Sequence, residues 1–467
     1  MKSCTRRLGS VLLALGLVFP ATMLAAQTAA AGQPVPSVAA GQATPPETQQ
    51  QIDDRRRDTL RYGIESEITD LLQSLDGEKN GAFNDDILKL LRASRSAKLR
   101  TAILGFYTDL SWKGAEQDAV DLVASRDRQD TGLVAAALSY LAEIRSKAAL
   151  VYVKDILHDA DKKLLPGAIR LMGRAGGPEE EDLLIGYLDS DAATDDLKQS
   201  AIRSLGDIGS AKAADRLMKL VQDNAQGKST RMYACESLGK IHDVRAIPAL
   251  VAAANGDDLN VRASAIDALA AFTDQEAVTA IEAALRDNAL QVRVAACKAC
   301  AKLHLADAVP AIIYKAKSDP EKTVRTEAFR SLAEMGGPDA LGFLGACVDD
   351  AKSESTYRVV AFGLLLRKDA TSMPILLARL VAEGKEKDRS LYTAFAREIS
   401  QAQDAPAAAP LVRVLFADSD YLIRLGGLEW ARKTKSPDIK PDLVQLAAND
   451  PSDYIRKRAA DILAQFN

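Results

Sequence analysis

The stretch Asp258-Leu-Asn-Val-Arg-Ala-Ser-Ala-Ile-Asp-Ala-Leu-Ala-Ala-Phe272 decides the fold, because its pattern returns through most of the chain. The next copy, Leu290-Gln-Val-Arg-Val-Ala-Ala-Cys-Lys-Ala-Cys-Ala-Lys-Leu303, keeps the Val-Arg pair, the alanine three residues later and the apolar residues at four, seven and ten. Apolar residues at these spacings lie on one face of an α-helix. Each copy is therefore predicted to be an amphipathic helix.

The arginine of this pattern marks twelve copies, separated by 31 to 34 residues. Its position is held in turn by Arg100, Val134, Leu165, Lys198, Arg231, Arg262, Arg293, Arg325, Arg358, Tyr392, Arg424 and Arg456. The register is uncertain by one residue at Leu165 and Tyr392, where the apolar pattern and the arginine position do not fit together. We call the eight arginines of this series the repeat arginines. An acidic residue often stands four positions earlier, as Asp258 does, where its carboxylate can accept a hydrogen bond at the start of the helix.

Shorter apolar runs lie between these helices and are predicted to be the first helix of each pair. They include Ala246–Ala254, Ala308–Ala316, Ala409–Phe416 and Asp442–Ala448. Prolines near their starts (Pro248, Pro310, Pro374, Pro410 and Pro441) suit the first turn of a helix, where the missing N–H has no partner within the helix. A unit of two short helices cannot bury its apolar face alone, so successive units must stack.

The repeated Asp-x-x-Val-Arg-x-x-Ala pattern resembles the HEAT repeat family, in the short-period variant named after phycobilisome bilin lyases. The resemblance covers residues 83–467 and implies an all-α fold, a right-handed α-α superhelix of about twelve helix pairs. It also implies that the second helices line the concave side and that the protein is a non-catalytic scaffold or adaptor that binds another protein. An accessory that holds a substrate or partner subunit, as a lyase or chaperone does, is the alternative.

The start of the chain has the pattern of a secretory signal. Lys2, Arg6 and Arg7 precede the apolar run Val11–Phe19, which is too short to span a bilayer comfortably. We expect residues 1–26 to be a cleaved signal peptide and the protein to be periplasmic or secreted, although an uncleaved anchor or a twin-arginine signal stays open. Residues 27–51 are predicted to be a disordered linker, 52–82 an N-terminal capping helix and 83–467 the repeats.

The candidate binding surface lies on the exposed side of the second helices, five residues after the repeat position. It comprises Arg170, Arg203, Glu236, Asp267, Lys298 and Arg330. The charges are mixed, and an ordinary solvated surface is the alternative. We expect a protein partner, a monomeric protein and no membrane span after signal cleavage.

Composition favours this class of protein over catalytic and nucleic-acid-binding classes. The chain has 60 basic and 64 acidic residues and a net charge of -4, so its overall charge does not attract nucleic acid. Only 5% of its residues are aromatic. Its three histidines are far apart, and we expect no metal, no cofactor and no catalytic residues. Cys297 and Cys300 resemble a redox or metal pair, but they occupy the same repeat positions as Ile266 and Leu269 and are predicted to be buried thiols.

Overall fold

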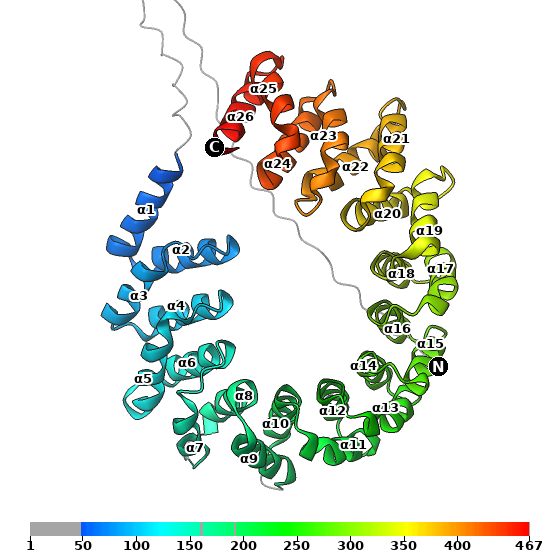
Figure 1. The fold of residues 1–467 in the computed structure, drawn as a ribbon. Coiled ribbons are helices and arrows are strands. Elements are labelled where there is room, and N and C mark those ends of the chain that lie inside the picture. The colour runs from blue at the N-terminus through cyan, green and yellow to red at the C-terminus, as the bar shows by residue number, and fades with distance from the viewer. Residues whose placement is uncertain (1–47, 159–161, 191–192, 467) are drawn as a thin grey trace, which may run out of the picture. The chain divides into compact units, whose positions relative to one another are not determined.

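The computed structural model describes residues 48–158, 162–190 and 193–466, and within these ranges it contains 26 α-helices and no strand (Figure 1). The predicted signal peptide and the linker up to residue 47 lie outside the described residues. The chain divides after Arg55, and the unit from Arg56 to Asn467 contains all the repeats. The predicted all-α class and the twelve helix pairs are confirmed.

The twelve pairs run from α3 to α26, with the first helix of each pair odd-numbered and the second even-numbered. The first helices are α3 (Asn84–Ala93), α5 (Glu116–Ala124), α7 (Leu150–His158), α9 (Pro178–Asp189), α11 (Ala214–Gln222), α13 (Ile247–Ala254), α15 (Gln275–Ala284), α17 (Val309–Ser318), α19 (Gly337–Asp349), α21 (Met373–Glu383), α23 (Ala409–Phe416) and α25 (Lys440–Asn449). The second helices are α4 (Ala97–Asp109), α6 (Thr131–Glu143), α8 (Leu165–Ala175), α10 (Asp195–Ile208), α12 (Lys228–Ile241), α14 (Leu259–Leu269), α16 (Leu290–Lys302), α18 (Lys322–Met335), α20 (Ser355–Lys368), α22 (Ser390–Gln401), α24 (Tyr421–Thr434) and α26 (Asp453–Leu463).

The segment before the first pair differs from the prediction. Where the sequence suggested one capping helix over residues 52–82, the structure has α1 (Gln49–Tyr62) and α2 (Glu65–Gly77). The break falls at Gly63, and Glu67 accepts a hydrogen bond from the backbone N–H of Ile64 at 3.0 Å, which caps the start of α2. The last three residues of the predicted linker, 49–51, belong to α1. The second of these helices, α2, packs on α4 as the second helices do on one another.

The helix ends follow the local signals in the sequence. The carboxylate of Asp258 accepts hydrogen bonds from the backbone N–H groups of Asn260 and Val261, at 2.8 and 3.1 Å. Asp130 and Asp420 cap α6 and α24 in the same way. The five prolines predicted to begin first helices all stand in the first turn of such a helix, in α13, α17, α21, α23 and α25. The aspartates thus fix the starts of α6, α14 and α24, and the prolines stand in the first turns of five first helices.

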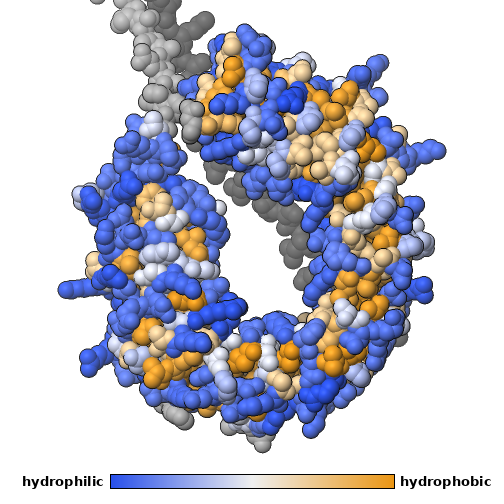
Figure 2. All heavy atoms as spheres, viewed as in Figure 1, coloured by the Kyte–Doolittle hydropathy of each residue, from blue (hydrophilic) through white to orange (hydrophobic). Residues whose placement is uncertain are grey.

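The helices form two layers, because each second helix packs on the second helices before and after it. From α8 to α18 these contacts are more extensive than those between first helices, so the second helices lie on the inner side of the bend between successive pairs. Small residues permit this close approach: a Cβ on Gly173 would lie 2.5 Å from the Cβ of Ser204, and one on Gly206 would lie 2.7 Å from that of Ser237. Figure 2 shows hydrophilic residues along both borders of the helix stack and hydrophobic residues between them.

The four cysteines in the described part of the chain are free and buried, as predicted from their repeat positions. Cys297 and Cys300 are fully enclosed in α16 among the apolar residues of the core. Burial raises the pKa of each of these two thiols to about 12, so both are protonated at neutral pH. They contribute to packing in the same way as the aliphatic residues at equivalent positions in other repeats.

Candidate protein-binding surface

The six residues of the predicted binding surface are all exposed and lie on consecutive second helices. They belong to α8, α10, α12, α14, α16 and α18. Because the residues three, four and seven after the repeat position face the core, the residue five after it points away from the core. The structure therefore places the predicted set along one layer of helices that contact one another.

Several side chains of this surface are already engaged with neighbouring repeats. The guanidinium carbon of Arg203 on α10 lies 4.7 Å from the ring centroid of Tyr233 on α12. Lys240 on α12 forms ion pairs with Glu236 at 2.6 Å and with Asp207 on α10 at 3.0 Å. Exposed ion pairs of this kind contribute little to stability, but they fix where each charge stands on the surface.

A cleft of about 480 Å³ lies on this layer where α12, α14 and α16 meet, and its lining contains both signs of charge. Its lining includes Glu236, Lys240, Asp267 and Lys302. Burial raises the pKa of Asp267 above its usual value, although Lys298 and Lys302 act in the opposite direction. The surface therefore offers a partner mixed hydrogen-bond donors and acceptors rather than one sign of charge.

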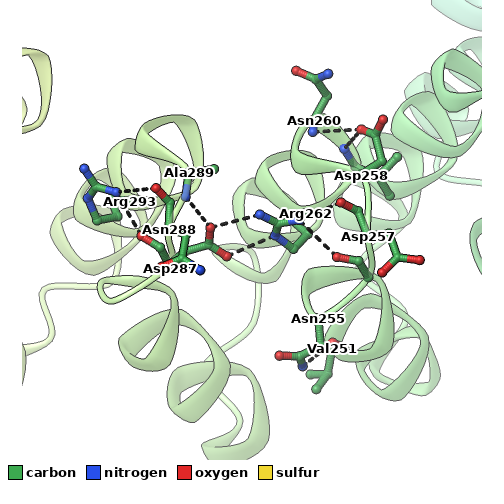
Figure 3. Close-up of polar contacts among 12 residues, drawn as sticks. Val251, Asn255, Asp257, Asp258, Asn260, Arg262, Asp287, Asn288, Ala289 and Arg293 are labelled. Atoms are coloured by element: carbon green, nitrogen blue, oxygen red, sulfur yellow. Dashed lines mark hydrogen bonds and ion pairs between the residues drawn. The ribbon is translucent and has the colours of Figure 1, made fainter. Parts of the chain in front are cut away.

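The repeat arginines lie near the starts of the second helices, and Arg262 and Arg293 reach into the loops that precede second helices (Figure 3). Arg262 donates two hydrogen bonds to the carboxylate of Asp287, both at 3.0 Å, and others to the carbonyls of Gly256 and Asp257. The hydrogen bonds to Asp287 raise the pKa of Arg262. Arg262 thus fastens the loop before its own helix to the loop before the next second helix.

The same arrangement recurs with deeper burial at two other arginines. Arg293 contacts both oxygens of Asp319 at 2.9 Å, and Arg424 contacts those of Asp450 at 2.8 and 3.0 Å. We call these three contacts, Arg262–Asp287, Arg293–Asp319 and Arg424–Asp450, the arginine ladder. Burial acts to raise the pKa of Asp319, but the hydrogen bonds from Arg293 and from the N–H of Glu321 outweigh it, so this pKa lies below its usual value.

The other repeat arginines depart from this pattern. Arg358 contacts Glu383 at 2.8 Å, and Arg231 donates to the carbonyl of Val221 at 3.0 Å. Arg456 contacts the carbonyl of Asp450 and the carboxylate of Asp453. The Nε of Arg100 is buried and has no hydrogen-bond partner within residues 48–466 as described.

In the repeat whose arginine position is held by Tyr392, another residue, Arg389, makes the contact with the next repeat. Tyr392 is buried in the core, whereas Arg389, three residues earlier, forms the ion pair with Asp418 of the next repeat. The guanidinium carbon of Arg389 also lies 4.5 Å from the ring centroid of Tyr392. The uncertain register at Tyr392 therefore reflects a real change in which residue reaches the neighbouring loop.

A second cleft, which the sequence did not predict, lies between the α17–α18 pair and the α19–α20 pair. Its volume is about 590 Å³, and it is lined by the repeat arginine Arg325 and by Phe329, Phe343 and Tyr357, among other residues. Arg325 donates to the hydroxyl oxygen of Tyr357 at 2.6 Å instead of to a carboxylate. The cleft thus coincides with a gap in the arginine ladder.

The described residues contain no group of three or more His, Cys, Asp or Glu side chains placed to hold a metal ion. Among the helices that the structure describes, none is both long and apolar enough to cross a membrane. His242 and His304 stand at the ends of α12 and α16 with positive φ angles of 61° and 50°, and the ring of His242 stacks on Phe272 at 5.0 Å. Both histidines thus stand in turns that follow helices, and His242 also packs on an aromatic ring.

The stacked pairs, the two helix layers and the arginine ladder define an α-solenoid of the HEAT type. A model of the family described as spirochaete HEAT repeat protein matches residues 60–462. The chain therefore belongs to this family. No curated protein matches the sequence.

Solved structures share the fold at low sequence identity. The complex of CpcE and CpcF of phycocyanin lyase from Nostoc is 21% identical over 55% of this chain and 94% of that chain, with a TM-score of 0.32. Importin beta is 12% identical over 89% of this chain and 67% of that chain, with a TM-score of 0.43. The karyopherin Kap121p, solved with the SUMO protease Ulp1p bound, is 12% identical over 88% of this chain and 50% of its own, with a TM-score of 0.40. The chain thus spans about half of Kap121p.

Proposed function

We propose that this protein is a non-catalytic scaffold that binds another protein on the exposed side of its second helices. The observation that carries the proposal is that the buried positions of the second helices repeat from pair to pair, whereas an exposed position does not. The buried positions repeat from pair to pair as Ala, Ile, Leu or Cys, whereas the exposed position five residues after the repeat arginine changes from Arg203 to Glu236 to Asp267. A rigid surface with a different side chain on each helix can recognise one partner without losing much conformational entropy on binding.

We also propose that the protein is exported to the periplasm or beyond as a monomer after removal of residues 1–26. The support is the basic start, with Lys2, Arg6 and Arg7, followed by the apolar run Val11–Phe19. Amino-terminal sequencing of the protein recovered from the envelope fraction tests this. A chain recovered intact from the cytoplasm would contradict the export, and the mass of the purified protein in solution tests the monomer.

In-cell crosslinking tests the binding surface. A photoreactive residue is placed at Arg203, Asp267 or Arg330, and in control variants at Lys219 or Glu276, which are exposed on the first helices α11 and α15. We expect one protein to be captured from the second-helix positions and not from the controls. Equal capture from both layers, or none from the second helices, would contradict the proposed surface and favour the alternative function, an accessory that holds a small substrate.

A further inference from the structure

The loop before α20 differs from four other loops in the spacing between its aspartate and its repeat arginine. In four loops an aspartate stands six residues before the repeat arginine of its own helix: Asp287 and Arg293, Asp319 and Arg325, Asp418 and Arg424, Asp450 and Arg456. In the loop before α20 this spacing is eight, from Asp350 to Arg358. The Asp350 carboxylate accepts hydrogen bonds within its own loop, from the N–H of Lys352 at 2.9 Å and from the hydroxyl of Ser353 at 3.2 Å. It forms no ion pair with Arg325, the arginine that precedes it in the series, in the part of the chain that the structure describes.

Arg325 is therefore only partly satisfied. Its Nη1 donates to the carbonyls of Asp319 and Pro320, and its Nε donates to the hydroxyl oxygen of Tyr357. Among the described residues, its Nη2 has no hydrogen-bond acceptor within reach, whereas the Nη2 of Arg293 donates to Asp319 at 2.9 Å. The Tyr357 hydroxyl, which accepts from Arg325, keeps its own hydrogen available to donate.

Aromatic rings lie beside these donors in the lining of the cleft. The ring of Phe329 stacks on that of Tyr357, with centroids 5.3 Å apart, and lies 5.5 Å from the ring of Phe343. The ammonium of Lys317 lies 5.4 Å from the centroid of Phe343. The cleft thus joins two donors for a carboxylate to an aromatic surface for an apolar side chain.

The charges around the cleft permit an incoming carboxylate. Asp319 also lines the cleft, but its charge is already balanced by Arg293 at 2.9 Å and by Lys315 at 3.4 Å. The other charged lining residues are three cations, Lys317, Arg325 and Lys352, and two carboxylates, Asp350 and Glu354. One further negative charge would balance this set.

We propose that the cleft binds an aspartate side chain of the partner protein, in a segment that also places an apolar side chain against the partly exposed ring of Phe343. This inference rests on the proposed function as a protein-binding scaffold. One carboxylate oxygen accepts from Nη2 of Arg325 and the other from the hydroxyl of Tyr357. The partner's carboxylate then takes from Nη2 of Arg325 the hydrogen bond that Asp319 takes from Nη2 of Arg293, while the Tyr357 hydroxyl keeps the place at Nε, and the arginine ladder gains a contact supplied by another molecule.

The probe that tests the cleft is the capped peptide acetyl-Phe-Asp-Phe-amide, titrated into the full-length chain and followed by NMR. We expect the aspartate peptide to bind at least tenfold more tightly than acetyl-Phe-Asn-Phe-amide, and Arg325→Gln to remove most of this difference. Tyr357→Phe keeps the ring and is expected to weaken binding several-fold. Lys322→Gln, on the same helix but outside both the cleft and the candidate binding surface, is the matched control and is expected to bind as the unchanged chain does.

Three results would overturn the proposal: no binding of the aspartate peptide, equal binding of the asparagine peptide, or unchanged binding by Arg325→Gln. If acetyl-Phe-Phe with a free carboxyl end bound more tightly than the aspartate peptide, the cleft would be assigned to a chain terminus. The proposal that it binds an aspartate side chain would then be wrong. Thermal melts of each variant exclude loss of folding as the cause. If the peptide test failed, the crosslinking result from Arg203 and Asp267 would be unchanged. Failure of the cleft proposal is therefore distinguishable from failure of the proposed scaffold function.

Discussion

Replacing Asp319 by alanine should open the stack between α16 and α18. The substitution removes both carboxylate acceptors of Arg293, which keeps its contacts with the carbonyls of Asp287 and Asn288, and it removes the acceptor of the Glu321 N–H. It leaves a guanidinium whose side chain is only 8% exposed without its carboxylate. Removing one partner of a buried ion pair costs about 3–5 kcal/mol, because the remaining charge stays buried without compensation. We expect a loss in this range.

Asp350→Ala is the matched control. Asp350 accepts hydrogen bonds in the equivalent loop, from the N–H of Lys352 and the hydroxyl of Ser353, but it has no arginine partner. Loss of such a cap costs about 1 kcal/mol. The difference between the two variants, about 2–4 kcal/mol, isolates the contact with Arg293.

Native-state hydrogen exchange is the appropriate assay, since repeat proteins open in parts and one global free energy does not describe them. In Asp319→Ala the backbone amides of α16 and α18 should lose protection, while those of α6 and α24 keep theirs. A loss no larger than that of Asp350→Ala would refute the reasoning that the ladder holds neighbouring repeats together.

Three further predictions concern packing, pH and thiol reactivity. Gly206→Ala should destabilise the protein by about 1–3 kcal/mol, because the new Cβ would lie 2.6 Å from the hydroxyl oxygen of Ser237. In Gly105→Ala the new Cβ meets nothing within 4 Å, so this substitution should stabilise α4 by about 0.5–1 kcal/mol. Urea unfolding measures both effects. The pKa of Asp319 is lower in the folded protein than the value of about 3.9 in the unfolded chain, so its ionised carboxylate stabilises the folded state above that pH. This stabilisation is lost as the pH falls through the folded pKa. Protection of the α18 amides should therefore drop below about pH 4, and the drop should be absent in Asp319→Ala. Cys297, buried and with its pKa raised to about 12, should not react with a thiol reagent at pH 8 until urea unfolds the chain; fast reaction in the native state would contradict the packing of α16.

The sequence predicted the helix pairs because each depends on local signals. The apolar spacing around Arg262, the cap at Asp258 and the proline at Pro248 all act within a few residues, and all three behave in the structure as the pattern indicates. The capping segment was less well predicted, since α1 and α2 meet at Gly63 within one continuous run of helical pattern, and the break depends on the backbone of Ile64 and the side chain of Glu67.

The carboxylate partners in the arginine ladder could not be predicted with the same reliability, because each lies 25 or 26 residues from its arginine. The sequence drew attention to the carboxylate four residues before the arginine, as Asp258 stands before Arg262, yet Arg262 contacts the aspartate of the following loop, Asp287. The six-residue spacing from Asp319 to Arg325 was visible in the sequence and could have identified these aspartates, as the eight-residue spacing from Asp350 to Arg358 could have marked the gap. The cleft itself depends on the packing of aromatic side chains from α18, α19 and α20, which no spacing describes.

The arginine ladder also bears on how such a chain can change its length. Arg262 contacts its own loop through one part of the guanidinium and the following aspartate through the other, and Arg293 does the same with an equivalent geometry. If α15 and α16 were removed together, Arg262 would meet Asp319 in the place of Asp287. Whole pairs can therefore be duplicated or lost during evolution, or exchanged by a protein engineer, without redesign of the junction.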